Sequence, residues 1–175
     1  MDPEQGSCLL NDFPRRMDLG PTVNLVSGHL VACYDFSCDI YQEGSWNHLQ
    51  NTTVGRKFHS SASTKDAVLL IGGGGSNSTE WIPMDGSPAH QGGFTVRHGN
   101  SHCTIQTSDS VIVVTGGDWS FNYVTRYQLD HGGETALTPL RRGRMDHACG
   151  VYQDGSGQQV SERGMLQKFS LFDFA

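Results

Sequence analysis

The sequence predicts an all-β fold made of repeated units, and three observations support this prediction. A polar residue, a short apolar run and a glycine pair follow one another in residues 66–73, and the same order returns in residues 109–117. Such a run is too short for a helix and suits a buried strand that stops where the backbone turns tightly. Histidines recur independently at a similar interval of about 44 residues; they are His59, His102 and His147.

The composition agrees with a β protein that is rich in turns. The chain has 175 residues, of which 22 are glycines, and it has few runs of the charged residues that favour helices. Its formal net charge of −6 gives no bulk electrostatic support for binding nucleic acid or an anionic membrane. No stretch approaches the roughly 18 apolar residues of a membrane span, so no span is predicted.

The chain begins with a segment that has no clear period. Residues 1–27 are mostly polar, and we interpret them as an extension or as the end of a preceding unit. The repeat is expected to begin at residue 28. Its first unit has an apolar run that ends at Cys33, where other units reach their glycines, and a later strand at Trp46 that follows a turn.

Two complete units are predicted next. Each contains a histidine, a glycine pair and an aromatic residue in the same order, and the members are His59, Gly72, Gly73 and Trp81, then His102, Gly116, Gly117 and Tyr127. A fourth unit opens around His147, but neither an apolar run nor a glycine pair follows Tyr152. We therefore assign residues 28–152 to the repeat and residues 153–175 to a non-repeat tail.

Each unit has the length and strand content of one four-stranded blade of a β-propeller. The residues resemble the kelch repeat, which places an arginine and a histidine before the first strand and a glycine pair after an apolar one. Arg56, His59 and the segment 71–73 match this pattern, and residues 38–49 match the last half of a kelch unit. The competing WD repeat would need Gly-His and Trp-Asp in every unit, and only Gly28-His29 is present.

The resemblance implies a kelch-type propeller fragment that does not close, because two complete units and two partial ones are too few. Strand edges and a blade face would then be exposed, and self-association through unpaired blade edges is expected. The implied function is a non-catalytic protein-interaction module whose loops lie on one rim. The partner is expected to be a protein of unknown identity.

Two alternatives follow from the same resemblance. One is a kelch adaptor that recruits substrates to a cullin-type ubiquitin ligase, which would need an upstream helical dimerisation domain; residues 1–27 are short and polar for that role. The other is a copper oxidase on a kelch-type propeller. It would need a set of tyrosine, cysteine and histidine ligands that these spacings do not assemble.

No catalytic, cofactor-binding or metal-binding residues are predicted. The three repeated histidines would be spaced around a ring, and no ligand spacing typical of zinc is present. The glycine-rich residues 71–77 lack the Lys-Ser/Thr and the helix of a phosphate-binding loop. The basic residues 141–144 precede a first strand, where the repeat places arginine, so a solvated or structural role is expected.

The five cysteines are an odd number, so at least one has no partner within the chain. Cys33 and Cys38 flank the turn that replaces the glycine pair, which places their Cβ atoms near bridging range and resembles secreted kelch-like proteins with a cysteine pair there. The alternative is two free thiols in a reducing cytosol. Cys103 and Cys149 are one position out of register in adjacent units, so no bridge between them is predicted.

Two sequons for N-glycosylation begin at Asn51 and Asn77, and both fall in predicted loops. Together with the pair Cys33 and Cys38, they favour a secreted or extracellular protein over a cytoplasmic one. No signal peptide is visible, because the first 30 residues lack an apolar core segment.

Overall fold

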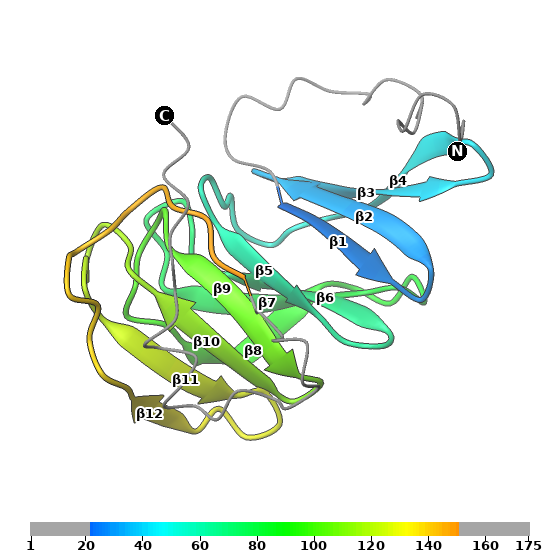
Figure 1. Ribbon diagram of the computed structural model, residues 1–175. Helices are drawn as coiled ribbons and strands as arrows, with labels where there is room; N and C mark the ends of the chain where they lie inside the picture. The colour runs from blue at the N-terminus through cyan, green and yellow to red at the C-terminus, as the bar shows by residue number, and fades with distance from the viewer. Residues whose placement is uncertain (1–21, 151–175) are drawn as a thin grey trace, which may run out of the picture.

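The structure, a computed structural model, describes residues 22–150, which form twelve β-strands in three sheets and no helix (Figure 1). The strands of the first sheet are β1 (Thr22–Val26), β2 (His29–Tyr34), β3 (Ser37–Gln42) and β4 (Ser45–Asn51). Those of the second are β5 (Ser60–Ser63), β6 (Ala67–Ile71), β7 (Ser78–Pro83) and β8 (His90–Thr95). Those of the third are β9 (Cys103–Ser108), β10 (Val111–Thr115), β11 (Val124–Gln128) and β12 (Glu134–Ala136).

Within each sheet the strands follow one another in chain order, and every neighbouring pair is antiparallel. None of the three sheets is closed into a barrel. The prediction of an all-β fold made of open, four-stranded antiparallel sheets is therefore confirmed.

The three sheets meet along their first strands. β1 contacts β5, and β5 contacts β9, as Figure 1 shows at the centre of the molecule. Side chains also join these strands: the Asn24 amide donates to the Ser61 hydroxyl at 2.9 Å, and Ser60 Oγ lies 2.5 Å from Thr104 Oγ1. Successive units are therefore stacked with first strand beside first strand.

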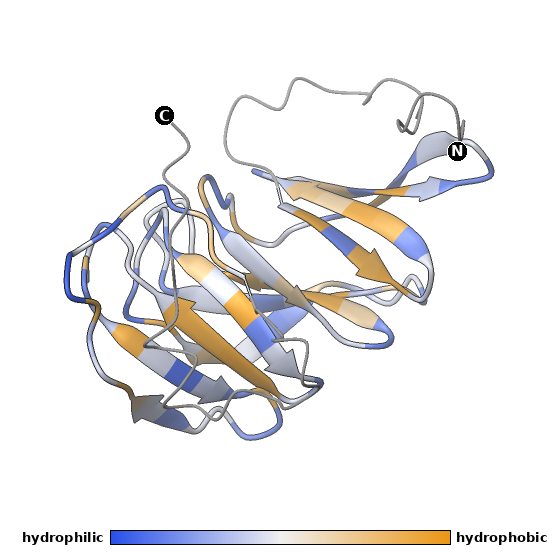
Figure 2. Cartoon of the chain, viewed as in Figure 1, coloured by the Kyte–Doolittle hydropathy of each residue, from blue (hydrophilic) through white to orange (hydrophobic). Residues whose placement is uncertain are grey.

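The core lies between the sheets, which explains the apolar runs in the sequence. In β6, Val68 and Leu70 pack against the first sheet, and Leu69 and Ile71 pack against the third. All four side chains are completely buried, and each contributes roughly 2 kcal/mol of transfer free energy. The middle sheet is covered on both faces, so its second strand, β6, does not alternate between apolar and polar side chains. Figure 2 shows that β2 and β10, the second strands of the other two sheets, are also mainly hydrophobic.

The first sheet begins earlier than the boundary at residue 28. Thr22–Val26 forms β1 and pairs with β2 over its whole length, so the described chain holds three four-stranded sheets where two complete units were expected. The segment lacks a continuous apolar run because Asn24 turns toward the second sheet and bonds there with Ser61. The predicted tail, residues 153–175, lies outside the described residues.

Candidate interaction rim

The repeated glycines hold adjacent units in contact. Gly72 has a φ of +60°, and a Cβ at this position would lie 2.6 Å from the carbonyl oxygen of Gly99 and 2.8 Å from the ring of His102. Gly116 has a φ of +64° and meets the next unit in the same way, with His147 at 2.6 Å from its Cβ position. Both glycines are therefore required by the positive φ and by the close approach of the following linker.

The second glycine of each pair packs against the histidine of its own unit. A Cβ on Gly73 would lie 2.6 Å from the Cβ of His59, and one on Gly117 would lie 3.1 Å from the Cβ of His102. The Gly117 amide also donates to the Arg144 carbonyl at 2.9 Å. The glycine pair and the histidine of the sequence repeat thus form one packing unit.

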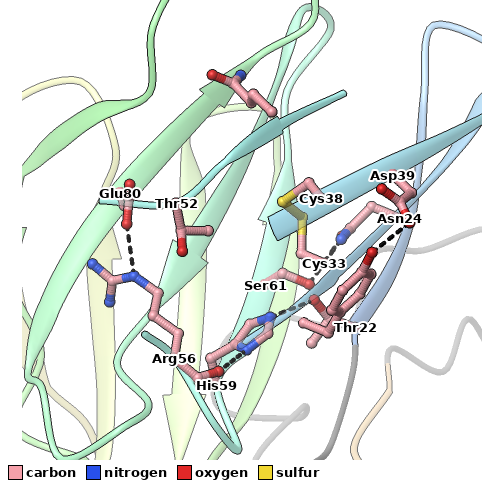
Figure 3. The surroundings of a disulfide bond; sticks show 12 residues. Thr22, Asn24, Cys33, Cys38, Asp39, Thr52, Arg56, His59, Ser61 and Glu80 are labelled. Atoms are coloured by element: carbon pink, nitrogen blue, oxygen red, sulfur yellow. Dashed lines mark hydrogen bonds and ion pairs between the residues drawn. A yellow bond between two sulfur atoms is a disulfide. The ribbon is translucent and has the colours of Figure 1, made fainter. Parts of the chain in front are cut away.

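His59 is buried at the junction of the first two sheets (Figure 3). Its Nδ1 donates to the Arg56 carbonyl at 2.5 Å, which leaves Nε2 to accept from the Thr22 hydroxyl at 2.8 Å. Burial lowers the pKa of His59 from 6.5 to about 4, and the Arg56 carbonyl offsets part of this effect. The ring is therefore neutral at pH 7 and acts as a structural hydrogen-bonding group.

His102 and His147 repeat this position in the next two units. Burial, followed by repulsion from His98, lowers the pKa of His102 to about 3. His147 Nε2 lies 2.8 Å from Thr115 Oγ1, and burial lowers the pKa of His147 as well. No group of three histidine, cysteine or carboxylate side chains gathers around a common point within residues 22–150.

The three predicted aromatic residues do not share one structural position. Trp46 on β4 packs edge-on against Tyr41, with ring centroids 5.3 Å apart. Trp81 pairs with Leu69, whereas Tyr127 pairs with Ile112, which is one position earlier in its strand relative to the glycines. Trp81 and Tyr127 therefore lie on opposite sides of the same core, between the second and third sheets.

A buried ion pair holds the linker between the first two sheets, and the sequence did not reveal it. Arg56 Nε donates to Glu80 Oε2 at 2.9 Å, with the two side chains only 1% and 0% exposed (Figure 3). The Arg56 guanidinium also donates to the carbonyls of Gly72 and Ser78, each at 2.9 Å. The other Glu80 oxygen accepts from the Thr53 amide at 2.5 Å.

At the equivalent place in the third sheet, the side chains of His98 and Thr125 replace the ion pair. His98 Nδ1 donates to the Gly116 carbonyl at 2.7 Å, as Arg56 does to Gly72, and His98 Nε2 lies 3.1 Å from Thr125 Oγ1. Burial lowers the pKa of His98, so the neutral ring suits this neutral partner. Two different polar pairs therefore secure the same junction in successive units.

The predicted disulfide between Cys33 and Cys38 is present. The two residues are directly opposite on β2 and β3, their Cα atoms are 4.1 Å apart, and both are completely buried. The sulfur atoms pack in the core between the first and second sheets. Figure 3 shows this bridge beside the first strands.

A second disulfide, which the sequence did not predict, joins Cys103 to Cys149, with Cα atoms 6.0 Å apart. Cys103 is one residue after His102, and Cys149 is two residues after His147. The same shift of one position separates facing residues of the preceding two units. In the preceding junction the same two positions are occupied by Ser60 and Thr104, whose hydroxyls lie 2.5 Å apart. The bridge therefore replaces a hydrogen bond of the repeat.

The loops at one end of the stack are joined by backbone hydrogen bonds. The Gly74 amide donates to the Lys57 carbonyl at 2.7 Å, the Asp118 amide to Asn100 at 3.1 Å, and the Arg144 amide to Phe121 at 2.6 Å. These contacts, together with the bond from the Thr52 amide to the Phe36 carbonyl at 3.0 Å, connect the loops after β2, β6 and β10 with the linkers after β4, β8 and β12. We call this surface the loop rim, and it comprises residues 35–36, 52–59, 72–77, 96–102, 116–123 and 137–150.

Large apolar side chains are exposed mainly on the loop rim. Seven of the nine in the described chain lie there: Phe36, Val54, Phe58, Trp119, Phe121, Tyr123 and Met145. The other two, Val23 and Leu25, are on β1. Trp119, Phe121 and Tyr123 alternate within one loop, and each is at least half exposed.

Both predicted glycosylation positions are exposed: Asn51 adjoins the loop rim, and Asn77 lies within it. Asn51 ends β4, and Asn77 precedes β7. The third residues of the two sequons differ in exposure: Thr53 is exposed, whereas Thr79 is buried and its hydroxyl donates to the Phe94 carbonyl at 2.7 Å. The folded chain therefore presents both the asparagine and the threonine of the first sequon, but only the asparagine of the second.

No model of a known protein family matches the chain, and no curated protein matches it. Among residues 22–150 there is no helix with the length and apolarity that crossing a bilayer requires.

Proposed function

We propose that the chain is a non-catalytic protein-interaction module that binds a partner protein through the loop rim. The observation that carries this proposal is the concentration of seven exposed large apolar side chains on one end of the stack. Single exposed apolar residues are ordinary, but a gathering of aromatic side chains with polar neighbours is typical of an interaction surface. Tyrosine and tryptophan are also the residues that most often dominate such interfaces.

The backbone at Phe58 supports this proposal. Phe58 has a φ of 55°, in the left-handed region that a bulky residue rarely adopts, and its side chain is 43% exposed. The residues at the same position of the next units, Ser101 and Asp146, have φ of 54° and 51°. A phenylalanine that stands in a strained position and leaves 43% of its surface in solvent gains less from burial than a core residue does, which is consistent with a role in binding.

The kelch-type ancestry belongs to the same proposal. In this reading the three sheets are blades of a longer propeller, and a preceding blade would cover the outer face of β1. Val23 and Leu25 on that face are 53% and 65% exposed, which leaves an apolar strip for self-association in the present chain. A sedimentation series over protein concentration tests this: a compact monomer at every concentration would contradict it.

The two disulfides favour an oxidising compartment. They therefore support an extracellular interaction module over a cytosolic ubiquitin-ligase adaptor. Glycosylation at Asn51 and Asn77 would have the same implication, and mass spectrometry of the protein from a secreting host measures it directly.

Binding is tested by comparing one triple variant and one double variant with the unaltered chain. Trp119→Ser, Phe121→Ser and Tyr123→Ser together remove the apolar surface of one rim loop, and Val23→Ser with Leu25→Ser removes exposed apolar surface elsewhere. The two variants and the unaltered chain are each immobilised and exposed to extracellular fluid. The partner proteins that each one retains are then quantified, and their binding is titrated individually. We expect the rim variant to lose a protein that the β1 variant retains; identical retention by all three would contradict the proposal.

A further inference from the structure

We propose that the disulfide between Cys103 and Cys149 is a reducible link that controls the attachment of residues 140–149, and with them the shape of the aromatic rim loop, residues 119–123. The consequence for partner binding rests on the proposed function. The opening itself does not, and it is measured without a partner.

The two disulfides differ in accessibility. Cys33 and Cys38 are completely buried in the core between two sheets, whereas Cys103 and Cys149 are both partly exposed. Reduction begins when a thiolate reaches one of the sulfur atoms, so access controls its rate. An external dithiol therefore reaches the bridge between Cys103 and Cys149 first.

The segment that this bridge holds is supported by hydrogen bonds but has neither a buried residue nor a strand of its own. No residue of 140–149 is buried, and the described part of the fourth unit contributes no strand to pack against the third sheet. By contrast, β9 is held on β5 by a complete sheet and an apolar core, so the hydroxyl pair of Ser60 and Thr104 is sufficient there. The disulfide between Cys103 and Cys149 therefore takes the place of the hydroxyl pair at a junction that lacks a complete sheet on one side.

Residues 140–149 make hydrogen bonds to the aromatic rim loop and to residues on either side of it: the Asp146 amide donates to the Ser101 carbonyl at 3.0 Å, and the Arg144 carbonyl accepts from the Gly117 amide at 2.9 Å. The Leu140 amide donates to the Asn122 carbonyl at 2.8 Å, and the Arg144 amide donates to the Phe121 carbonyl at 2.6 Å. His147 Nε2 lies 2.8 Å from Thr115 Oγ1, at the base of the same loop. Release of the segment removes these bonds and leaves residues 119–123 without their neighbour.

The chemistry is a thiol–disulfide exchange with an external dithiol, such as a thioredoxin-type protein. Its thiolate attacks one sulfur of the bridge, forming a mixed disulfide and releasing one cysteine thiolate, which takes up a proton. The second thiol of the dithiol then displaces the other cysteine, and the dithiol is oxidised to a disulfide. The chain gains two electrons and two protons, and the reverse exchange restores the link.

The first test uses the 175-residue chain and dithiothreitol. Samples taken over time are alkylated and mapped by mass spectrometry, and hydrogen exchange is measured in parallel. We expect Cys103 and Cys149 to be alkylated at least tenfold faster than Cys33 and Cys38, with faster exchange confined to residues 117–123 and 140–149. Equal reduction rates, unchanged exchange in these segments, or unfolding of all three sheets would each overturn the proposal.

The second test removes the bond without a reductant. Cys103→Ser with Cys149→Thr installs the hydroxyl pair that the preceding junction carries at Ser60 and Thr104. We expect this variant to exchange like the reduced chain in residues 140–149, with the circular dichroism of the sheets unchanged. Protection equal to that of the oxidised chain would show that the covalent link is dispensable and would overturn the proposal.

Discussion

The buried ion pair between Arg56 and Glu80 makes a sharp prediction about stability. Substitution of Glu80 by Met leaves the Arg56 guanidinium buried without its counterion, and the Thr53 amide without its acceptor. Both partners are essentially inaccessible to water, so solvent cannot replace the lost interaction. Removal of one partner of such a pair typically costs about 3–5 kcal/mol.

The double variant separates this penalty from the value of the pair itself. Arg56→Met with Glu80→Met removes both charges and fills a similar volume, and such replacements are often close to neutral. Here the carbonyls of Gly72 and Ser78 also lose a donor, so we expect a cost of about 2 kcal/mol, from the loss of hydrogen bonds alone. The double variant should therefore be more stable than Glu80→Met.

The assay is urea unfolding followed by circular dichroism, with the free energies of unfolding combined in a double-mutant cycle. The partly exposed pair of Lys57 and Asp35, whose charged atoms are 3.9 Å apart, is the matched control. Lys57→Met should change the free energy of unfolding by less than about 1 kcal/mol. The reasoning would be refuted if Glu80→Met cost no more than Lys57→Met, or if the two Met substitutions were additive.

Three further predictions follow from the junctions between units. His59 has a pKa of about 4 when folded and an ordinary value of 6.5, so its contribution is complete above pH 6.5 and is lost as the pH falls toward 4; because His98, His102 and His147 also have lowered pKa values, the drop in the free energy of unfolding over this range should be roughly 3 kcal/mol smaller in His59→Gln than in the unaltered chain. Gly72→Ala combines a positive φ with a backbone clash and should cost roughly 3 kcal/mol, whereas Gly75→Ala, with open space around it, should cost about 1 kcal/mol in urea unfolding; equal losses would contradict the packing described. Phe58→Asn should leave thermal stability unchanged or slightly raised, because asparagine tolerates the left-handed backbone, while it weakens binding of a rim partner; a clear loss of stability would show that Phe58 serves the fold.

The sequence predicted the elements whose pattern is set by burial on both faces. Residues 68–71 have an apolar side chain at every position because one neighbouring sheet covers each face, and the glycines follow because the next linker touches them. β1 was not predicted, because it is covered on one face only and bonds across the junction through Asn24. A strand that alternates within five residues is difficult to distinguish from an irregular extension.

The contacts that join units could not be predicted from the spacing of residues alone. Glu80 is 24 positions after Arg56, and nothing local relates them until β7 is placed beside the linker. To predict the bridge between Cys103 and Cys149, one must know that adjacent units face each other with a shift of one position at their first strands. Trp81 and Tyr127 follow their glycine pairs in the same order, but Trp81 pairs with Leu69 and Tyr127 with Ile112, a difference in strand register that the order of residues does not show.

The most direct test of the stacking of units is an engineered bridge at the junction between the second and third sheets. Ser60→Cys with Thr104→Cys places cysteines at the positions that Cys103 and Cys149 occupy in the next junction. After oxidation and trypsin digestion, we predict a disulfide between the peptides of residues 58–65 and 98–126, formed alongside the two native bridges. Absence of this cross-link in the folded, oxidised protein would contradict the stacking of first strand against first strand.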